Sequence, residues 1–190
     1  MMPTAQEMAS GLRGAWRLLR FDSSGLIDFD ESVEGFWKSF YAAALTAPGY
    51  VIVVAMHLSD AELPGGFLHL VLVESCSYVI EWVAYPLAIF YITEMMGKPE
   101  AFIRFIVALN WSRVIQMILY LPVLLLVDAE AFAPQFGNLL TVAVTIAVLV
   151  YQWFVTRSAL AINGLPAGLL VALDLAISVV IVRVTDAMVI

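Results

Sequence analysis

Two charged side chains, Glu81 and Arg113, are the best placed in this chain to do chemistry, because each lies near the middle of a long apolar stretch. The turn Gly97-Lys98-Pro99 separates the two stretches. At a rise of roughly 1.5 Å per residue, a helical hairpin that turns here brings the two charges to within about 3 Å of equal depth. A charge at bilayer depth is costly and usually has a partner or lines a pathway. The sequence therefore predicts a Glu81–Arg113 ion pair, which either fixes the hairpin or serves proton or ligand handling.

The same antiparallel register brings further polar side chains together. Glu74 comes opposite Tyr120, and Tyr78 comes opposite Gln116. Polar residues of one apolar stretch therefore meet polar residues of the next.

Asp174 is a further charge inside an apolar stretch, the last one of the chain. A hairpin at residues 163–166 sets it about one turn from Gln152 and about two turns from Arg157, at roughly 5.4 Å per turn. We expect Gln152, Tyr151 or Arg157 to satisfy the Asp174 carboxylate, with proton or substrate handling as the alternative role. The candidate intramembrane polar residues are therefore Glu74, Glu81, Arg113, Gln116, Tyr120, Gln152, Arg157 and Asp174.

The elements that must hold these side chains are membrane-spanning helices. The chain has 190 residues, of which 63% are hydrophobic and 13% are charged. Its mean hydropathy of +0.94 goes with a composition far more apolar than that of an ordinary globular domain. Several stretches reach the roughly 20 apolar residues that cross a bilayer. We expect an all-α polytopic bundle (37–190) after an N-terminal segment (1–36), with five spans at residues 37–57, 67–95, 101–127, 136–160 and 165–188.

The basic residues predict the direction of the spans. The loops around residues 60–62 and 128–130 contain acids and no base. The positive-inside rule therefore places the N-terminus in the cytoplasm and the C-terminus outside. Arg183 is the exception, and we expect it to pair with Asp186 on the same helical face. The bases that fall on the cytoplasmic side are Arg13, Arg17, Arg20, Lys38, Lys98, Arg104 and Arg157.

Residues 1–36 have the pattern of a membrane-surface segment. Met8, Leu12, Trp16 and Leu19 recur at helical spacing, and arginines occupy much of the opposite side. We expect an amphipathic helix in the headgroup layer, although a docking helix for a partner protein would have the same pattern. The candidate lipid-facing or partner-facing residues are Arg13, Trp16, Arg17 and Arg20.

Charge and motifs exclude several classes of function. A net charge of −7 argues against a nucleic-acid partner, since phosphate binding needs clustered bases. The sequence contains no G-x-S-x-G, Walker, H-E-x-x-H or C-x-x-C motif, so we expect no enzyme. His57 and His69 match no metal-ligand spacing, and we expect neither a metal nor a cofactor. Cys76 lies within a span and is expected to be a small buried residue.

The final hairpin carries a resemblance to a known family. Residues 151–160 read YQWFVTRSAL and residues 165–170 read LPAGLL, with a short polar turn between them. Together with five close-packed spans after a cytoplasmic segment, this resembles the Yip family of Ypt-interacting-protein-like membrane proteins. The resemblance implies a bacterial inner-membrane bundle without enzymatic chemistry, involved in membrane organisation, transport or protein association.

The function that we expect is that of a scaffold or accessory subunit of a membrane assembly, in contact with membrane lipids and with a protein partner in the membrane. The alternative is a small transporter, or an ion or proton pathway, that uses Glu74, Glu81, Arg113 and Asp174. A wet cavity that reaches Glu81 favours transport. A dry, closed ion pair with a large apolar patch favours assembly.

Overall fold

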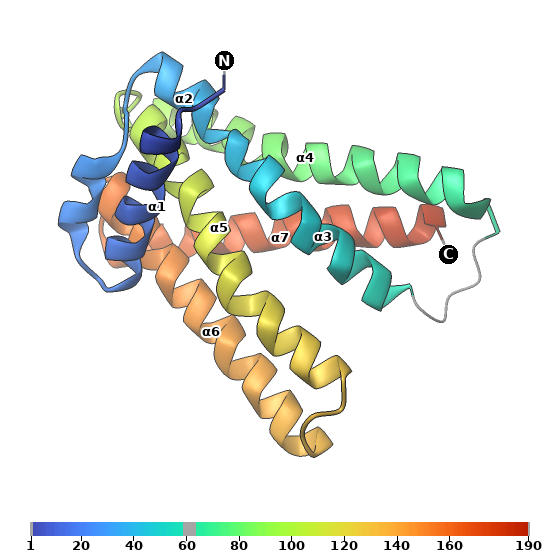
Figure 1. Cartoon of the computed structure of the whole chain (residues 1–190). Helices are drawn as coiled ribbons and strands as arrows, with labels where there is room; N and C mark the ends of the chain where they lie inside the picture. The colour runs from blue at the N-terminus through green and yellow to red at the C-terminus, as the bar shows by residue number, and fades with distance from the viewer. Residues whose placement is uncertain (1, 59–63, 190) are drawn as a thin grey trace.

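The computed structural model describes residues 2–58 and 64–189, and every regular element in that part of the chain is helical (Figure 1). The prediction of an all-α fold is therefore confirmed. A short 3-10 helix, η1, follows the first α-helix. The elements are α1 (Ala5–Leu19), η1 (Ser23–Asp28), α2 (Val33–Ser39), α3 (Tyr41–His57), α4 (Gly66–Met95), α5 (Ala101–Asp128), α6 (Pro134–Ala159) and α7 (Gly164–Val189).

Five helical segments are long and apolar enough to cross a membrane. The first of them combines α2 and α3 over Val33–His57, and α4 to α7 are the other four. The shortest segment has 25 residues, or about 38 Å at the helical rise, against a hydrocarbon core of about 30 Å. The chain is therefore a multi-pass membrane protein. The first span begins at residue 33 rather than 37, because Ser32 caps α2 by accepting a hydrogen bond from the Gly35 amide.

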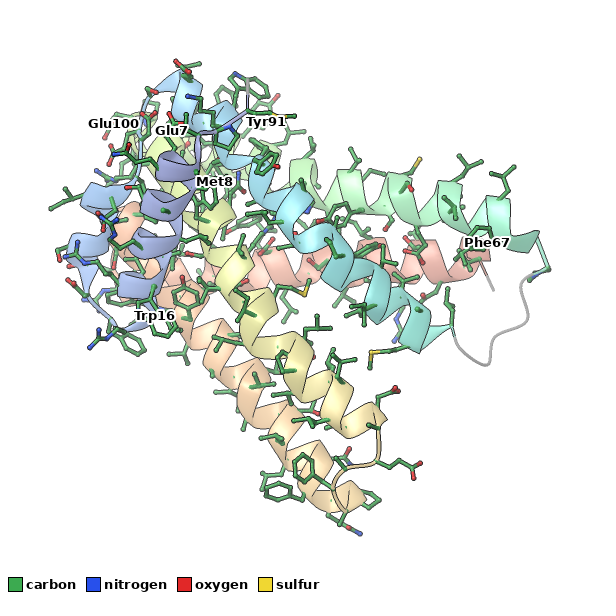
Figure 2. The ribbon with its side chains drawn as sticks, in the orientation of Figure 1. Glu7, Met8, Trp16, Phe67, Tyr91 and Glu100 are labelled. Atoms are coloured by element: carbon green, nitrogen blue, oxygen red, sulfur yellow. The ribbon has the colours of Figure 1, made fainter. Side chains whose placement is uncertain are left out.

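The outer faces of the spans are apolar, as contact with lipid tails requires. Phe67 and Tyr91, near the two ends of α4 (Figure 2), are each more than half exposed. Cys76 is also exposed on α4, so the prediction that it is buried was wrong. Helical periodicity sets it on the outward side, one residue before the inward-facing Ser77.

The spans form two diverging pairs rather than a chain of hairpins. α4 lies along α7 and α5 lies along α6, while α3 packs on α5 (Figure 1). Hydrogen bonds join α4 to α7 along its length, from Tyr85 Oη to the Leu170 carbonyl at 3.1 Å and from Thr185 Oγ1 to Ser77 Oγ at 2.7 Å. α4 and α5 diverge from the turn between them (Figure 1). The predicted hairpin register was therefore wrong for residues far from that turn.

The N-terminal helix packs on the spans instead of lying apart from them. Ala15 and Leu18 of α1 are fully buried in the same core cluster as Phe105 of α5. The Tyr151 hydroxyl of α6 donates to the Ala15 carbonyl at 2.8 Å. The predicted apolar stripe packs against this protein core, with only Trp16 about half exposed. An amphipathic pattern alone does not distinguish burial against lipid from burial against protein, which is why the sequence reading placed the stripe in the headgroup layer.

Arg17 is held within the protein. Its guanidinium forms ion pairs with Asp22 and Asp28, each at 3.0 Å. Hydrogen bonds from Ser24 and then from Arg17 lower the pKa of Asp22. Arg17 is thus a structural residue of the N-terminal layer, whereas Arg13 and Arg20 are exposed.

The turn between α4 and α5 meets the turn between α6 and α7 at the α1 end of the bundle. Lys98 Nζ donates to the Ala161 carbonyl at 2.7 Å, and Arg104 Nε donates to the Ala159 carbonyl at 2.6 Å. The predicted pair of Arg183 with Asp186 does not form in the described part of the chain. Asp186 instead lies 3.5 Å from His57 Nε2 at the opposite end of the bundle.

Candidate functional site

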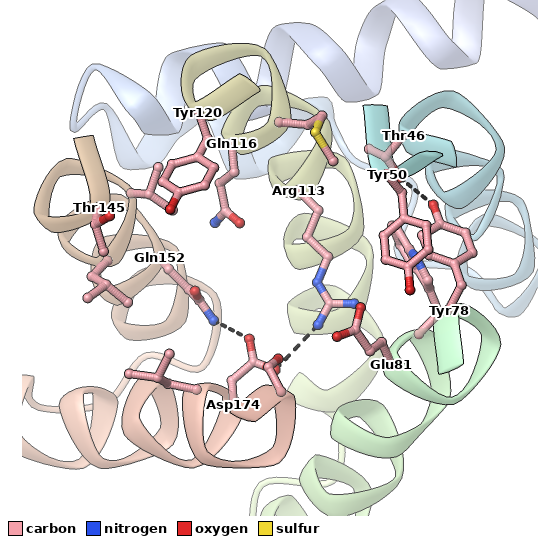
Figure 3. A pocket seen from close by; sticks show the side chains of 16 residues that line it. Thr46, Tyr50, Tyr78, Glu81, Arg113, Gln116, Tyr120, Thr145, Gln152 and Asp174 are labelled. Carbon is pink, nitrogen blue, oxygen red and sulfur yellow. Dashed lines mark hydrogen bonds and ion pairs between the residues drawn. The ribbon is translucent and has the colours of Figure 1, made fainter. Parts of the chain in front are cut away.

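A cavity of about 350 Å³ lies at the middle of the spans (Figure 3). All five spans contribute to its wall. Its volume is near the lower limit of the roughly 300–1,000 Å³ that is typical of small-molecule pockets. The lining residues are Thr46, Tyr50, Tyr78, Glu81, Trp82, Arg113, Gln116, Met117, Tyr120, Thr145, Val148, Leu149, Gln152, Asp174, Leu175 and Ser178.

Helical spacing explains how each span supplies one face. On α5 the polar lining side chains are Arg113, Gln116 and Tyr120, at intervals of three and four residues. On α7, Asp174 and Ser178 are four residues apart. Residues three or four apart lie on one side of a helix. The polar residues of the spans therefore converge on one interior space.

Arg113 pairs with Asp174 and not with Glu81. Arg113 Nη2 lies 3.4 Å from Asp174 Oδ1, and Gln152 Nε2 donates to Asp174 Oδ2 at 2.6 Å (Figure 3). The predicted Glu81–Arg113 ion pair was therefore wrong. The predicted contact between Gln152 and Asp174 is confirmed.

Arg113 lies at nearly the expected depth along α4, but the α4 side chain that faces it is Trp82 and not Glu81. Its guanidinium stacks over the Trp82 ring, 5.0 Å from the ring centroid. Trp82 follows Glu81 directly, and successive residues are about 100° apart around a helix with 3.6 residues per turn. The indole thus takes the position next to Arg113 that the sequence reading gave to the carboxylate.

Glu81 lines the cavity without a hydrogen bond or ion pair to any residue in the described part of the chain. Arg113 and Asp174 carry opposite charges, so Glu81 supplies the one charge of the wall that is not matched by a direct contact. A carboxylate at bilayer depth has a large desolvation cost unless water, a proton or a ligand compensates it. Glu81 is therefore the candidate functional group of the cavity.

Gln116 adds an unpaired donor. Its Nε2 atom is buried and has no hydrogen-bond partner in the described residues. Buried amide groups are almost always satisfied, by protein or by ordered water. An acceptor that enters the cavity would satisfy Gln116 while Glu81 receives a donor or a cation.

Aromatic side chains form the wall around Glu81. The rings of Tyr50 and Tyr78 are 4.5 Å apart between centroids, and Trp82 lies 6.2 Å from Tyr78. The Tyr50 hydroxyl donates to Glu74 Oε2 at 2.7 Å. Glu74 therefore has a partner on α3 and lies outside the cavity wall, so the expected meeting of Glu74 with Tyr120 does not occur.

The remaining predicted residues are divided between the cavity and the surface. Tyr120 lines the cavity. Arg157 is exposed at the end of α6 and stacks on Trp153 at 5.5 Å. The Tyr151 hydroxyl, considered as a partner of Asp174, instead donates to the Ala15 carbonyl of α1 and lies 2.9 Å from Ser112 Oγ.

Several residues that line the cavity were not predicted from the sequence. Thr46 and Tyr50 come from the first span, for which no polar face was considered. Thr145 and Ser178 were also missed. The available signal was the spacing of four residues between Thr46 and Tyr50 and between Asp174 and Ser178.

No protein-family model, curated protein or solved structure matches this chain. The class of protein is therefore defined by the fold and the cavity alone, as a multi-pass helical membrane protein with a largely apolar cavity that contains charged and amide side chains. The site is suited to holding a small polar solute or a proton. Among the described residues, its wall contains a carboxylate without a direct partner, a buried amide donor without a partner and the Arg113–Asp174 ion pair.

Proposed function

We propose that this protein is a carrier that binds a small polar solute in the intramembrane cavity and moves it across the bilayer without changing it chemically. The observation that carries the proposal is Glu81, a carboxylate in the cavity wall that has no hydrogen bond or ion pair with any residue of the described chain. Ionisable residues at membrane depth mark solute and proton pathways when they face an internal cavity.

The fixed groups have a separate role in this proposal. Gln152 and Arg113 hold both oxygens of Asp174, and Trp82 supports Arg113 from α4. This cluster links α4, α5, α6 and α7 around the cavity. Displacing the members of such a network is a way for an arriving solute to change how the two helix pairs pack.

The carrier is favoured over a scaffold or accessory subunit. A scaffold would need no cavity that contains polar groups without partners, and a closed ion pair would suffice to fix its helices. The apolar outer faces do not separate the two functions, because lipid contact requires such faces in either case.

We also propose the orientation that the bases favour, with the N-terminus in the cytoplasm. The support is the gathering of Lys98 and Arg104 at the α1 end of the bundle. A cysteine at Glu100 should be shielded from a membrane-impermeant thiol reagent in intact cells, and one at Gln135 should react, with Cys76 changed to Ala in both variants. Labelling at Glu100 from outside would show that the orientation is the reverse.

The Yip-like origin and the location in a bacterial inner membrane stay proposals that rest on residues 151–170.

The test of the carrier proposal is whether water-soluble reagents reach the cavity. Ser178→Cys places a thiol in the cavity wall, and Val179→Cys places one on the exposed outer face of the same helix. In the Cys76→Ala background, a small charged methanethiosulfonate should modify the first variant and leave the second unmodified, because lipid covers Val179. Equal resistance of both variants would mean that the cavity is closed to water, and the carrier proposal would be abandoned.

A further inference from the structure

The charges of the cavity wall leave room for one positive charge. Arg113 and Asp174 neutralise each other at 3.4 Å. Gln152 fixes the other oxygen of Asp174 at 2.6 Å, so the Asp174 carboxylate is already engaged on both sides. Glu81 then leaves the wall with a net charge of −1 when it is ionised. A monovalent cation restores neutrality, whereas an anion would meet an uncompensated carboxylate.

The polar groups of the wall also require an acceptor. Gln116 Nε2 is a buried donor without a partner in the described residues, and its neighbour on the α5 face is Arg113. A bare metal ion or a proton provides no acceptor. A solute that carries both a cationic group and an oxygen would satisfy Glu81 and Gln116 at once.

The oxygens of the wall suit an organic cation better than a metal ion. Thr46 Oγ1 and Tyr78 Oη lie 2.7 Å apart, and Tyr78 donates to the Ala43 carbonyl. Tyr50 Oη donates to Glu74. These hydroxyls already have partners, and a hard metal cation takes roughly six oxygens. The aromatic faces of Tyr50 and Tyr78 instead attract ammonium groups through the ring quadrupole.

We infer that the cavity binds a small organic monocation, with an ammonium group at Glu81 against the aromatic wall and an oxygen acceptor at Gln116. The inference rests on the proposed function, since it names the class of solute that the carrier would take. The volume of about 350 Å³ admits a molecule of this kind together with water.

The test measures binding of choline and of ethanolamine to the full chain in lipid nanodiscs, by titration calorimetry. The uncharged control is the carbon isostere of choline, in which a quaternary carbon replaces the nitrogen, and potassium chloride at equal ionic strength controls for inorganic cations. At least one of the two amines should bind, and the isostere and potassium should not. Glu81→Gln should weaken amine binding by at least about tenfold, or about 1.4 kcal/mol. Glu94→Gln is the matched control, because it makes the same change at an exposed position of α4 outside the cavity wall.

A labelling experiment separates failure of this inference from failure of the carrier proposal. The amine that binds should slow modification of the Ser178→Cys variant by at least about fivefold, and Glu81→Gln should remove this protection. If the thiol reacts at the same rate with and without the amines, the cavity is open but the solute is not an organic cation. If the isostere protects as well as choline does, charge is not what the site recognises, and the inference is also overturned. A thiol that never reacts contradicts both proposals.

Discussion

Replacing Arg113 by Met should destabilise the protein by about 3 to 5 kcal/mol, the cost of removing one member of a buried ion pair. The change leaves Asp174, which is only 9% exposed, with a single remaining partner, Gln152. It also removes the stacking of the guanidinium on Trp82 at 5.0 Å, which is worth about 0.5 to 2 kcal/mol. The lower part of the range is expected, because the cavity can admit water.

Double-mutant cycles identify the partner of Arg113. Adding Asp174→Asn to Arg113→Met should recover much of the loss, with a coupling energy of about 1.5 to 3 kcal/mol, typical of hydrogen bonds to charged groups. Glu81→Gln should couple to Arg113 more weakly, because no direct contact joins the two side chains. Glu81→Gln alone should leave the free energy of unfolding unchanged or raised, since it removes a buried charge that lacks a partner.

The assay is equilibrium unfolding in mixed micelles, in which a rising fraction of sodium dodecyl sulfate unfolds the helices and circular dichroism reports the transition. Each variant is compared with the parent under the same micelle composition. A coupling of Arg113 to Glu81 that exceeds its coupling to Asp174 would refute the account of the cavity, because the cation would then belong to the residue that we describe as unpaired.

Three further predictions concern the N-terminal layer. Tyr151→Phe should cost about 0.5 to 1.5 kcal/mol in the same unfolding assay, because it removes the buried hydrogen bond that the Tyr151 hydroxyl donates to the Ala15 carbonyl of α1; an unchanged midpoint would contradict this. Gly11→Leu should detach α1 and increase its proteolysis, since even a Cβ atom at this position would lie 2.5 Å from the Trp111 ring, and unchanged protease resistance would argue against the packing of α1 on α5. Hydrogen bonds from Lys38 and Thr4 lower the pKa of Glu7 from 4.5 to about 2. The contact therefore contributes stability that is fully present above pH 4.5 and is lost as the pH falls through 2, and Glu7→Gln should flatten that part of the stability profile.

Composition and helix punctuation were enough to predict the five spans. Gly164 and Pro166 mark the turn between the last two spans, and α7 begins at Gly164. Gly and Pro determine helix ends through the local backbone conformation, so these ends can be predicted without knowledge of the tertiary fold. The packing partners of each helix are not local. The sequence does not contain the angle at which α4 and α5 diverge, and the assumption that neighbours in sequence pair along their whole length therefore failed.

The site was partly predictable for the same reason. Asp174 and Gln152 belong to adjacent helices joined by a short turn, and their contact followed from depth alone. Two carboxylates at similar depth, Glu81 on α4 and Asp174 on α7, were possible partners of Arg113. Which of them contacts Arg113 depends on how each helix is rotated about its axis. A rotation of one residue on α4 exchanges Glu81 for Trp82. Tyr50 on the first span could not be predicted as a cavity residue, because the register considered only helices that are adjacent in the sequence.

The most direct test of the account is the rate at which a charged thiol reagent modifies the Ser178→Cys variant in right-side-out and in inverted membrane vesicles, with Val179→Cys as the lipid-facing control. A carrier must open its cavity to each side in turn, so the account predicts modification of the Ser178→Cys variant from both faces of the membrane and slow or no modification of the control. Modification from one face alone under every condition would make the cavity a binding site without passage. Modification from neither face would contradict the account altogether.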